Sequence, residues 1–147
     1  MNMRSKIALI AGLGMAFAAC GSAAAEDKDI IDYRQHIMKA MEEQTAIIGM
    51  IVSGAAPEEG MKASAESIAL GASIALKSFE AKVQGGKAKP EVWGKWDDFS
   101  TRMKTFAAKT QELSAAAKRG ASVAELTGIL VEALPCKQCH DDYRNEK

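Results

Sequence analysis

The chain of 147 residues has few of the residues that staple or interrupt small folds: three cysteines, three prolines and 5% aromatic residues. So few cysteines argue against a disulfide framework. The 19 basic and 19 acidic residues balance, and without a basic patch the sequence does not fit a nucleic-acid-binding protein. After residue 25, strand-forming runs and apolar runs of membrane-spanning length are absent, whereas Ala, Glu, Lys, Met and Leu dominate and favour helices.

The first 25 residues have the pattern of a secretory signal peptide. A short basic stretch precedes an apolar run from residue 7 to residue 19, which is too short to span a bilayer. Three alanines at 23–25 offer a cleavage site, so residues 26–147 are the predicted mature domain, exported to a bacterial periplasm. Processing at Cys20 would instead give a lipid-anchored protein, but the residues before Cys20 match that signal poorly.

Near the C-terminus, Cys136 and Cys139 are followed at once by His140, which is the attachment pattern of a c-type haem. On a helix, residues three apart lie on one face. Both thiols can therefore reach one edge of a porphyrin and form thioethers, and His140 can reach the iron as the proximal ligand.

Three other interpretations of this motif compete with haem attachment. A structural zinc site needs four ligands, but the sequence holds one further histidine, His36, and no second cysteine pair. A thioredoxin-like dithiol requires a βαβ context, which the helical composition does not provide. A plain disulfide would not need the histidine. Covalent haem is the interpretation that the rest of the chain supports.

Proline and glycine divide the mature chain into four helical segments, predicted at residues 29–53, 57–84, 90–120 and 122–144. The apolar stripe of the second segment is Met61, Ala65, Ile68, Ala72, Ala75 and Phe79. The stripe of the third is Trp96, Phe99, Met103, Phe106, Thr110, Leu113 and Ala117. Four amphipathic helices with short connections predict an all-α, antiparallel up-down-up-down four-helix bundle with a covalently attached haem.

Two residues stand out against these helices. Arg34 is the charged member of the first apolar stripe, and a charged group there needs a partner, which a haem propionate would provide. Pro135 removes a backbone hydrogen bond and is expected to kink the fourth helix immediately before the haem cysteines. The fourth segment opens with Ser122 and Glu125, a capping box.

The ligand on the other side of the iron decides the function. Met38 lies on the inner stripe of the first segment, whereas His36 is expected to point outward. If the Met38 thioether binds iron, the haem is six-coordinate and suits electron transfer. If Met38 only covers the iron, a diatomic gas such as NO or CO can bind.

The first two segments carry apolar residues on their outer faces as well. They are Ile47, Met50, Ile51, Leu70 and Ile74. Helices that are apolar on two faces usually bury both, which predicts a homodimer packed through these two segments.

Taken together, the sequence resembles the class II cytochromes c, the family of cytochrome c′ and its low-spin relatives. The resemblance rests on Tyr33-Arg34-Gln35 with Met38, on Pro90-Glu91-Val92-Trp93, and on the stretch from Cys136 to Arg144. It implies that Arg34 contacts a haem propionate, that Met38 occupies the distal position, and that Arg144 is a proximal-side arginine. Family members with methionine at the distal position include five- and six-coordinate proteins.

The sequence departs from this family in two places. The stretch 80–84 lacks the Pro-Gly turn expected after Phe79, and Pro135 replaces the small residue expected before the first haem cysteine. Neither departure touches the residues expected to attach the haem.

These observations predict a periplasmic mono-haem electron carrier that works with redox partner proteins and is not an enzyme. Cys136 and Cys139 would anchor the haem, His140 would be the proximal ligand and Met38 the distal one, with Arg34 on a propionate. The alternative is a five-coordinate protein that binds NO or CO. A catalytic role is disfavoured because no distal histidine or arginine is expected on the face of Met38 for acid–base work, since Arg34 is assigned to a propionate.

Overall fold

The structure, a computed structural model, describes residues 26–146 and is helical almost throughout this range. Because the predicted signal peptide and Cys20 lie outside the described residues, export and lipid anchoring stay predictions. The elements are α1 (Asp27–Val52), α2 (Gly60–Ala75), the short 3₁₀ turn η1 (Leu76–Phe79), α3 (Glu91–Gly94), α4 (Trp96–Lys118), α5 (Val123–Ala133) and α6 (Cys136–Tyr143).

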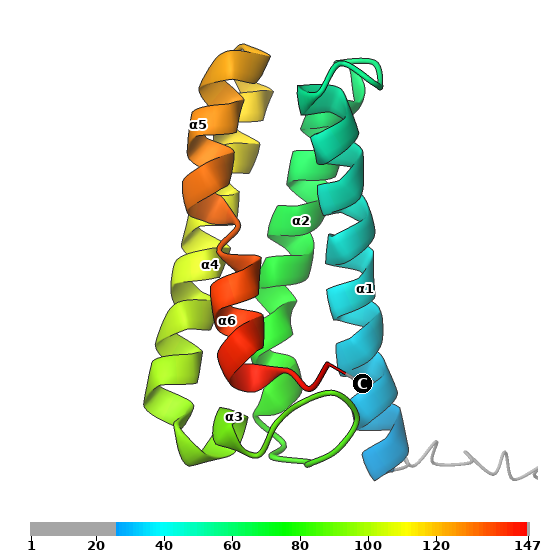
Figure 1. Cartoon of the computed structure of the whole chain (residues 1–147), viewed down its shortest axis with the longest axis vertical. Helices are drawn as coiled ribbons and strands as arrows, with labels where there is room; N and C mark the ends of the chain where they lie inside the picture. Colours follow the sequence, from blue (N-terminus) through cyan, green and yellow to red (C-terminus); the bar gives the residue numbers. More distant parts are fainter. Residues whose placement is uncertain (1–25, 147) are drawn as a thin grey trace, which may run out of the picture.

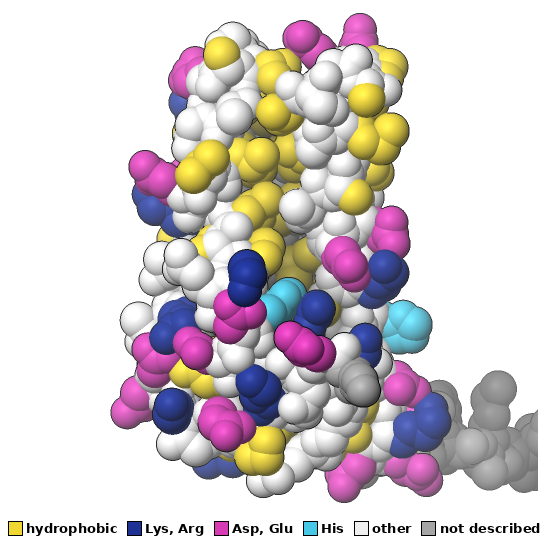
Figure 2. All heavy atoms as spheres, in the orientation of Figure 1, with side chains coloured by type: hydrophobic (Ala, Val, Ile, Leu, Met, Phe, Trp, Pro, Cys, Tyr) yellow, Lys and Arg dark blue, Asp and Glu magenta, His cyan; other side chains and the backbone are white. Residues whose placement is uncertain are grey.

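The long helices form an antiparallel four-helix bundle, in which α5 and α6 together make the fourth member (Figure 1). Helix α1 packs along α2, α2 along α4 and α4 along α5, whereas α1 and α5 scarcely touch. A strip of hydrophobic side chains runs down between α5 and α1 and reaches a histidine (Figure 2). The predicted fold is confirmed, and one side of the bundle lies open between its first and last members.

Two of the four predicted segments are broken into two helices. Lys95, with φ −123° and ψ 45°, separates α3 from α4. Leu134 and Pro135 separate α5 from α6, so the expected kink at Pro135 is a complete break in the helix. Proline provides no N–H for an intrahelical hydrogen bond, and it disfavours helical geometry in the residue before it.

The second segment ends earlier than predicted, at Phe79 rather than at residue 84. Lys82 has a φ of 55°, and the chain then folds back against α1 at Gly86. A Cβ atom at Gly86 would lie 2.7 Å from Cγ2 of Ile31, and its φ of 61° also suits glycine. The loop between η1 and α3 is therefore fixed closely to the first helix.

The helix ends follow the predicted signals. The backbone N–H of Glu125 donates to Oγ of Ser122 at 3.3 Å, which confirms the N-terminal cap of α5. Gly54, just past α1, and Gly120, past α4, have φ values of 76° and 77°, the left-handed conformation that ends many helices.

Two clusters of buried side chains form the core. We call the one beside α6 the site-end core, and its members are Ile37, Met41, Ala72, Ala75, Phe79, Val92, Phe99, Met103 and Tyr143. The far core contains Ile48, Ile51, Met61, Ala65, Ile68, Leu113, Ala116, Ala117 and Leu126. Every residue of the predicted α2 stripe is buried, and most of the α4 stripe is too.

One residue assigned to the outer faces belongs elsewhere. Ile51 is only 3% exposed and packs in the far core, so its placement on the back of the first helix was wrong. The buried stripe of α1 is wider than the stripe predicted from apolar residues spaced alternately three and four positions apart. The reason is that α1 contacts α2 as well as the interior of the bundle. Ile47, Met50, Leu70 and Ile74 remain exposed, as expected. None of the described helices has the length and hydropathy that a membrane crossing requires.

Candidate functional site

Helix α6 carries the sequence-predicted attachment motif at the open side of the bundle. Cys136 and Cys139 are free thiols at its first residue and one turn later, Cys136 exposed and Cys139 half-buried against the site-end core. Burial raises the pKa of both thiols, so they stay protonated at neutral pH. Two thiols on one face of a short exposed helix can bond to the same edge of a planar ligand.

His140 is half-buried beside Cys139. Burial lowers the pKa of its imidazole below the ordinary value, and the Arg144 guanidinium lowers it further, whereas Glu42 and Asp141 act in the opposite direction. The ring is therefore neutral near pH 7, which is the form that coordinates a metal. Among the described residues, no group of three His, Cys, Asp or Glu side chains could hold a bare metal ion, so the zinc alternative finds no support.

Arg34, on α1, is 3% exposed. Its Nη1 donates to the Val83 carbonyl at 2.6 Å, and its guanidinium carbon lies 5.1 Å and 5.3 Å from the ring centres of Phe79 and Trp93. Nη2, although buried, has no hydrogen-bond partner among residues 26–146. A buried cation with an unused donor is costly unless an acceptor binds it, so this position is suited to an anion.

The remaining predicted residues lie at different depths. Met38 is half-buried and packs against the same site-end core as Cys139, which brings the first helix and α6 to one site. His36 is exposed, in agreement with the prediction that it points outward. The Arg144 side chain is exposed. Its backbone is extended and forms an isolated antiparallel bridge with the backbone of Ala88.

Comparison with known proteins decides the family. The family model described as "Cytochrome C'" matches residues 29–144, which is most of the chain and nearly all of the described part. The chain belongs to the cytochrome c′ family. A curated relative, cytochrome c′ of Alcaligenes xylosoxydans xylosoxydans, is 29% identical over 126 residues, covering 84% of this chain and 98% of the relative.

Solved structures of cytochrome c′ share this fold as well. A nitric oxide complex of a leucine-to-valine mutant of cytochrome c prime from Alcaligenes xylosoxidans has a TM-score of 0.76 at 28% identity, covering 84% of this chain and 99% of that one. A carbon monoxide-bound leucine-to-glycine variant from the same organism has a TM-score of 0.75 at 29% identity, with 83% and 98% covered. A further structure named cytochrome c′ is 30% identical, with a TM-score of 0.75 and 83% and 99% covered.

As a cytochrome c′ family member, the protein carries a covalently attached c-type haem. The described residues fit such a group: two thiols and a neutral imidazole lie on α6, and the unused Nη2 donor of Arg34 could receive a propionate. Few contacts join α1 to α5, and hydrophobic side chains are exposed in the strip between these two helices (Figure 2).

Sequence reasoning missed a set of polar residues next to the motif. The Tyr143 hydroxyl donates to the Asp98 carboxylate, and Arg102 forms ion pairs with both Asp98 and Asp142. The spacing of four between Asp98 and Arg102 signals an ion pair on a helix, but nothing in the sequence shows that this pair faces α6. The sequence also offered no sign that the Val83 carbonyl accepts a hydrogen bond from Arg34.

Substituting Arg34→Met should destabilise the holoprotein by about 1.5–3 kcal/mol, because it removes a buried charged donor from the Val83 carbonyl and from any anion bound at Nη2. The free energy of unfolding, measured by denaturant titration followed by circular dichroism, tests this. The matched control is Arg119→Met, an exposed arginine at the end of α4, whose effect should stay within about 0.5 kcal/mol. Equal stability of the Arg34 variant and the wild type would contradict the proposed role.

Proposed function

We propose that this cytochrome c′ binds a diatomic gas, NO or CO, at the iron of its single haem. In this proposal Cys136 and Cys139 form the thioethers, His140 is the proximal ligand and Arg34 binds a propionate. The observation that carries this proposal is the kind of side chain that α1 presents to the site. Met38 is half-buried there, whereas His36, the other histidine of the described residues, is exposed and therefore not placed as a second histidine ligand.

Bound haem iron supplies a coordination position at which small ligands can bind. The residues of the chain supply the rest. The thioethers would keep the group on α6, the neutral His140 ring would coordinate the iron, and the apolar site-end core would limit the access of water. Relatives with nitric oxide and carbon monoxide bound support this choice of ligand. We propose binding rather than catalysis, because Arg34 donates to the Val83 carbonyl and His36 is exposed, so neither is placed for acid–base work at the iron.

The second candidate is the electron carrier that the sequence first suggested. It is favoured by Met38 itself, a thioether on the same core cluster as Cys139. If its sulfur completed the coordination, the haem would change redox state with little rearrangement, and redox proteins would be the partners.

The visible absorption spectrum of the purified holoprotein, oxidised and reduced, before and after addition of CO, separates the two candidates. We expect a high-spin ferric spectrum and a prompt shift of the reduced spectrum with CO. A low-spin spectrum with the weak red band of Met sulfur on ferric iron, unchanged by CO, would reverse the order of the two functions.

We place this activity in the periplasm, on the strength of the signal-peptide pattern in residues 1–25 and the attachment motif. Cleavage after residue 25 is preferred to lipid anchoring at Cys20. Mass spectrometry of the protein purified from its expression host would reveal the mature N-terminus.

We also propose a homodimer that packs through the outer faces of α1 and α2. Four large apolar side chains there are exposed: Ile47 by 38%, Met50 by 51%, Leu70 by 67% and Ile74 by 41%. An apolar surface shared by two adjacent helices suits a second copy of the same surface.

The substitution Leu70→Glu should weaken this dimer about a hundredfold, since burying an unpaired carboxylate costs on the order of 3 kcal/mol. Sedimentation velocity at micromolar concentration measures the change. The control is Val131→Glu, which places the same charge at a 76% exposed site on α5 and should leave the dimer intact. A monomeric wild-type protein would contradict the dimer.

A further inference from the structure

The helix that carries the attachment motif is poorly fixed by its own chain. Leu134 (φ −117°, ψ 62°) and Pro135 (φ −76°, ψ 42°) interrupt the helix before it, so the packing of α5 does not set the direction of α6. Of the eight residues of α6, only Tyr143 is fully buried. The orientation of α6, and of His140 on it, must therefore come from contacts with other elements.

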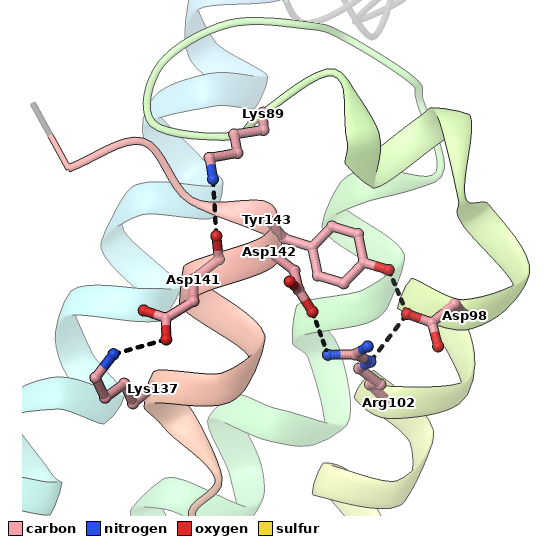
Figure 3. Close-up of polar contacts among 7 residues, drawn as sticks. All are labelled: Lys89, Asp98, Arg102, Lys137, Asp141, Asp142 and Tyr143. Atoms are coloured by element: carbon pink, nitrogen blue, oxygen red, sulfur yellow. Dashed lines mark hydrogen bonds and ion pairs between the residues drawn. The ribbon is translucent and has the colours of Figure 1, made fainter.

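Helix α4 provides those contacts through two of its residues, Asp98 and Arg102 (Figure 3). The Tyr143 hydroxyl donates to the Asp98 carboxylate. Arg102 donates through Nε to Asp98 at 2.9 Å and through Nη1 to Asp142 at 2.8 Å, and its guanidinium carbon lies 5.4 Å from the centre of the Tyr143 ring. The Tyr143 ring also packs edge-on against Phe99, with centroids 5.2 Å apart.

These contacts differ in strength. The Arg102 pairs are about half-exposed, and exposed ion pairs contribute little on their own. Tyr143, in contrast, is 4% exposed, and a buried hydroxyl that lost its acceptor would be costly. A phenol donating to a carboxylate forms a charge-assisted hydrogen bond, which is stronger than a neutral one. Arg102 holds the Asp98 carboxylate where the hydroxyl can reach it.

We propose that Asp98 and Arg102 are positioning residues for the proximal ligand: by holding Tyr143 and Asp142, they set the orientation of the His140 ring toward the iron. Tyr143 lies three residues after His140, on the same face of the last turn of α6. A displacement of that turn therefore rotates the imidazole. Groups that orient a metal ligand tune the metal without touching it. This inference rests on the proposed ligation by His140.

The end of α6 is also held by backbone hydrogen bonds. The N–H of Lys89 donates to the Tyr143 carbonyl at 3.0 Å, and the N–H of Asn145 donates to the Lys87 carbonyl at 2.8 Å. In addition, Lys89 Nζ donates to the Asp141 carbonyl at 2.8 Å (Figure 3). Changes at Asp98, Arg102 or the Tyr143 hydroxyl leave these bonds in place, so variants at these positions should fold and still attach haem.

The test compares the holoproteins of Tyr143→Phe, Asp98→Asn and Arg102→Gln with the wild type. Two properties of the iron site are measured: the reduction potential, and the paramagnetically shifted proton resonances of the His140 ring. We expect both to shift in all three variants, and most in Tyr143→Phe and Asp98→Asn. Arg102→Lys keeps the charge and should restore part of the wild-type values.

The matched control is Lys109→Gln. Lys109 is another basic residue of α4 that pairs within its helix and across to a neighbour, with Glu112 at 3.0 Å and with Glu132 of α5 at 3.4 Å, but it makes no such pair with α6. Its substitution should move neither property. If potential and ring resonances in Tyr143→Phe and Asp98→Asn equal those of the wild type, the inference is overturned, whatever the melting temperatures do.

Failure of the proposed ligation gives a different result. His140→Ala would then leave the spectrum of the covalently attached haem unchanged. If His140→Ala alters the spectrum while Tyr143→Phe, Asp98→Asn and Arg102→Gln do not shift the two measured properties, the ligation stands and the positioning role alone is rejected.

Discussion

Replacing both Cys136 and Cys139 by alanine is expected to abolish covalent retention of the haem. The two thiols are the cysteines of the described residues, and their spacing of three places both on one face of α6. Without thioethers the haem stabilises the fold only by reversible binding, so each tenfold dilution of free haem lowers stability by about 1.4 kcal/mol. Haem staining after denaturing electrophoresis and the mass of the intact polypeptide measure the loss.

Single variants sharpen this experiment. Cys136→Ala or Cys139→Ala should each retain haem through one remaining thioether, with a mass and a spectrum that differ from those of the wild type. Cys20→Ala serves as the control, since Cys20 belongs to the predicted leader, and this variant should retain haem in full. Haem that survived denaturation in the double variant would show that attachment occurs elsewhere.

Substituting Met38→Ala is expected to leave the ferric spectrum high-spin and to speed CO binding to the ferrous protein. Met38 is half-buried and packs against the site-end core, so in the proposed site its side chain would crowd the position where a gas binds. Removing that crowding should raise the association rate at least tenfold, which corresponds to about 1.4 kcal/mol in the barrier. Stopped-flow or flash-photolysis kinetics provide the measurement.

The control for Met38 is Met50→Ala, which shortens an exposed methionine of the same helix on its outer face. This variant should bind CO at the wild-type rate, even if it weakens the proposed dimer. A change of the Met38→Ala ferric protein from low-spin to high-spin, with loss of the red band, would identify Met38 as an iron ligand. Electron transfer would then become the leading function.

Periodicity predicted the helices well where a helix buries one stripe against its neighbours. The stripe of the second predicted segment, from Met61 in α2 to Phe79 in η1, is buried at every predicted position. The prediction failed for Ile51, which was assigned to an outer face and is 3% exposed. Near its end α1 packs against α2 in the far core as well as facing the bundle axis, and a single stripe cannot describe a helix with two buried directions.

Local chemistry predicted where helices begin and end, but less well where they break. The serine cap at Ser122 and the glycine at Gly54 were read correctly, because each depends on a few neighbouring residues. The break at Lys95 directly follows Gly94, but this glycine lies within an otherwise helical pattern, so α3 and α4 were predicted as one segment. A disturbance of the helix at Pro135 was predicted correctly, but the structure has a complete break there where a kink was expected.

In the candidate site, too, some features follow from the local sequence and others only from the packing of the helices. The spacing of Cys136, Cys139 and His140 by itself determined the attachment chemistry, since residues three apart on a helix share a face wherever that helix lies. The stripe position of Arg34 likewise implied a buried charge in need of a partner. Only the tertiary structure decided that Nη2 of Arg34 remains unpartnered and that the open side of the bundle lies between α1 and α5. It alone also brings Asp98 and Arg102 to α6, because contacts between residues some forty positions apart depend on how whole helices pack.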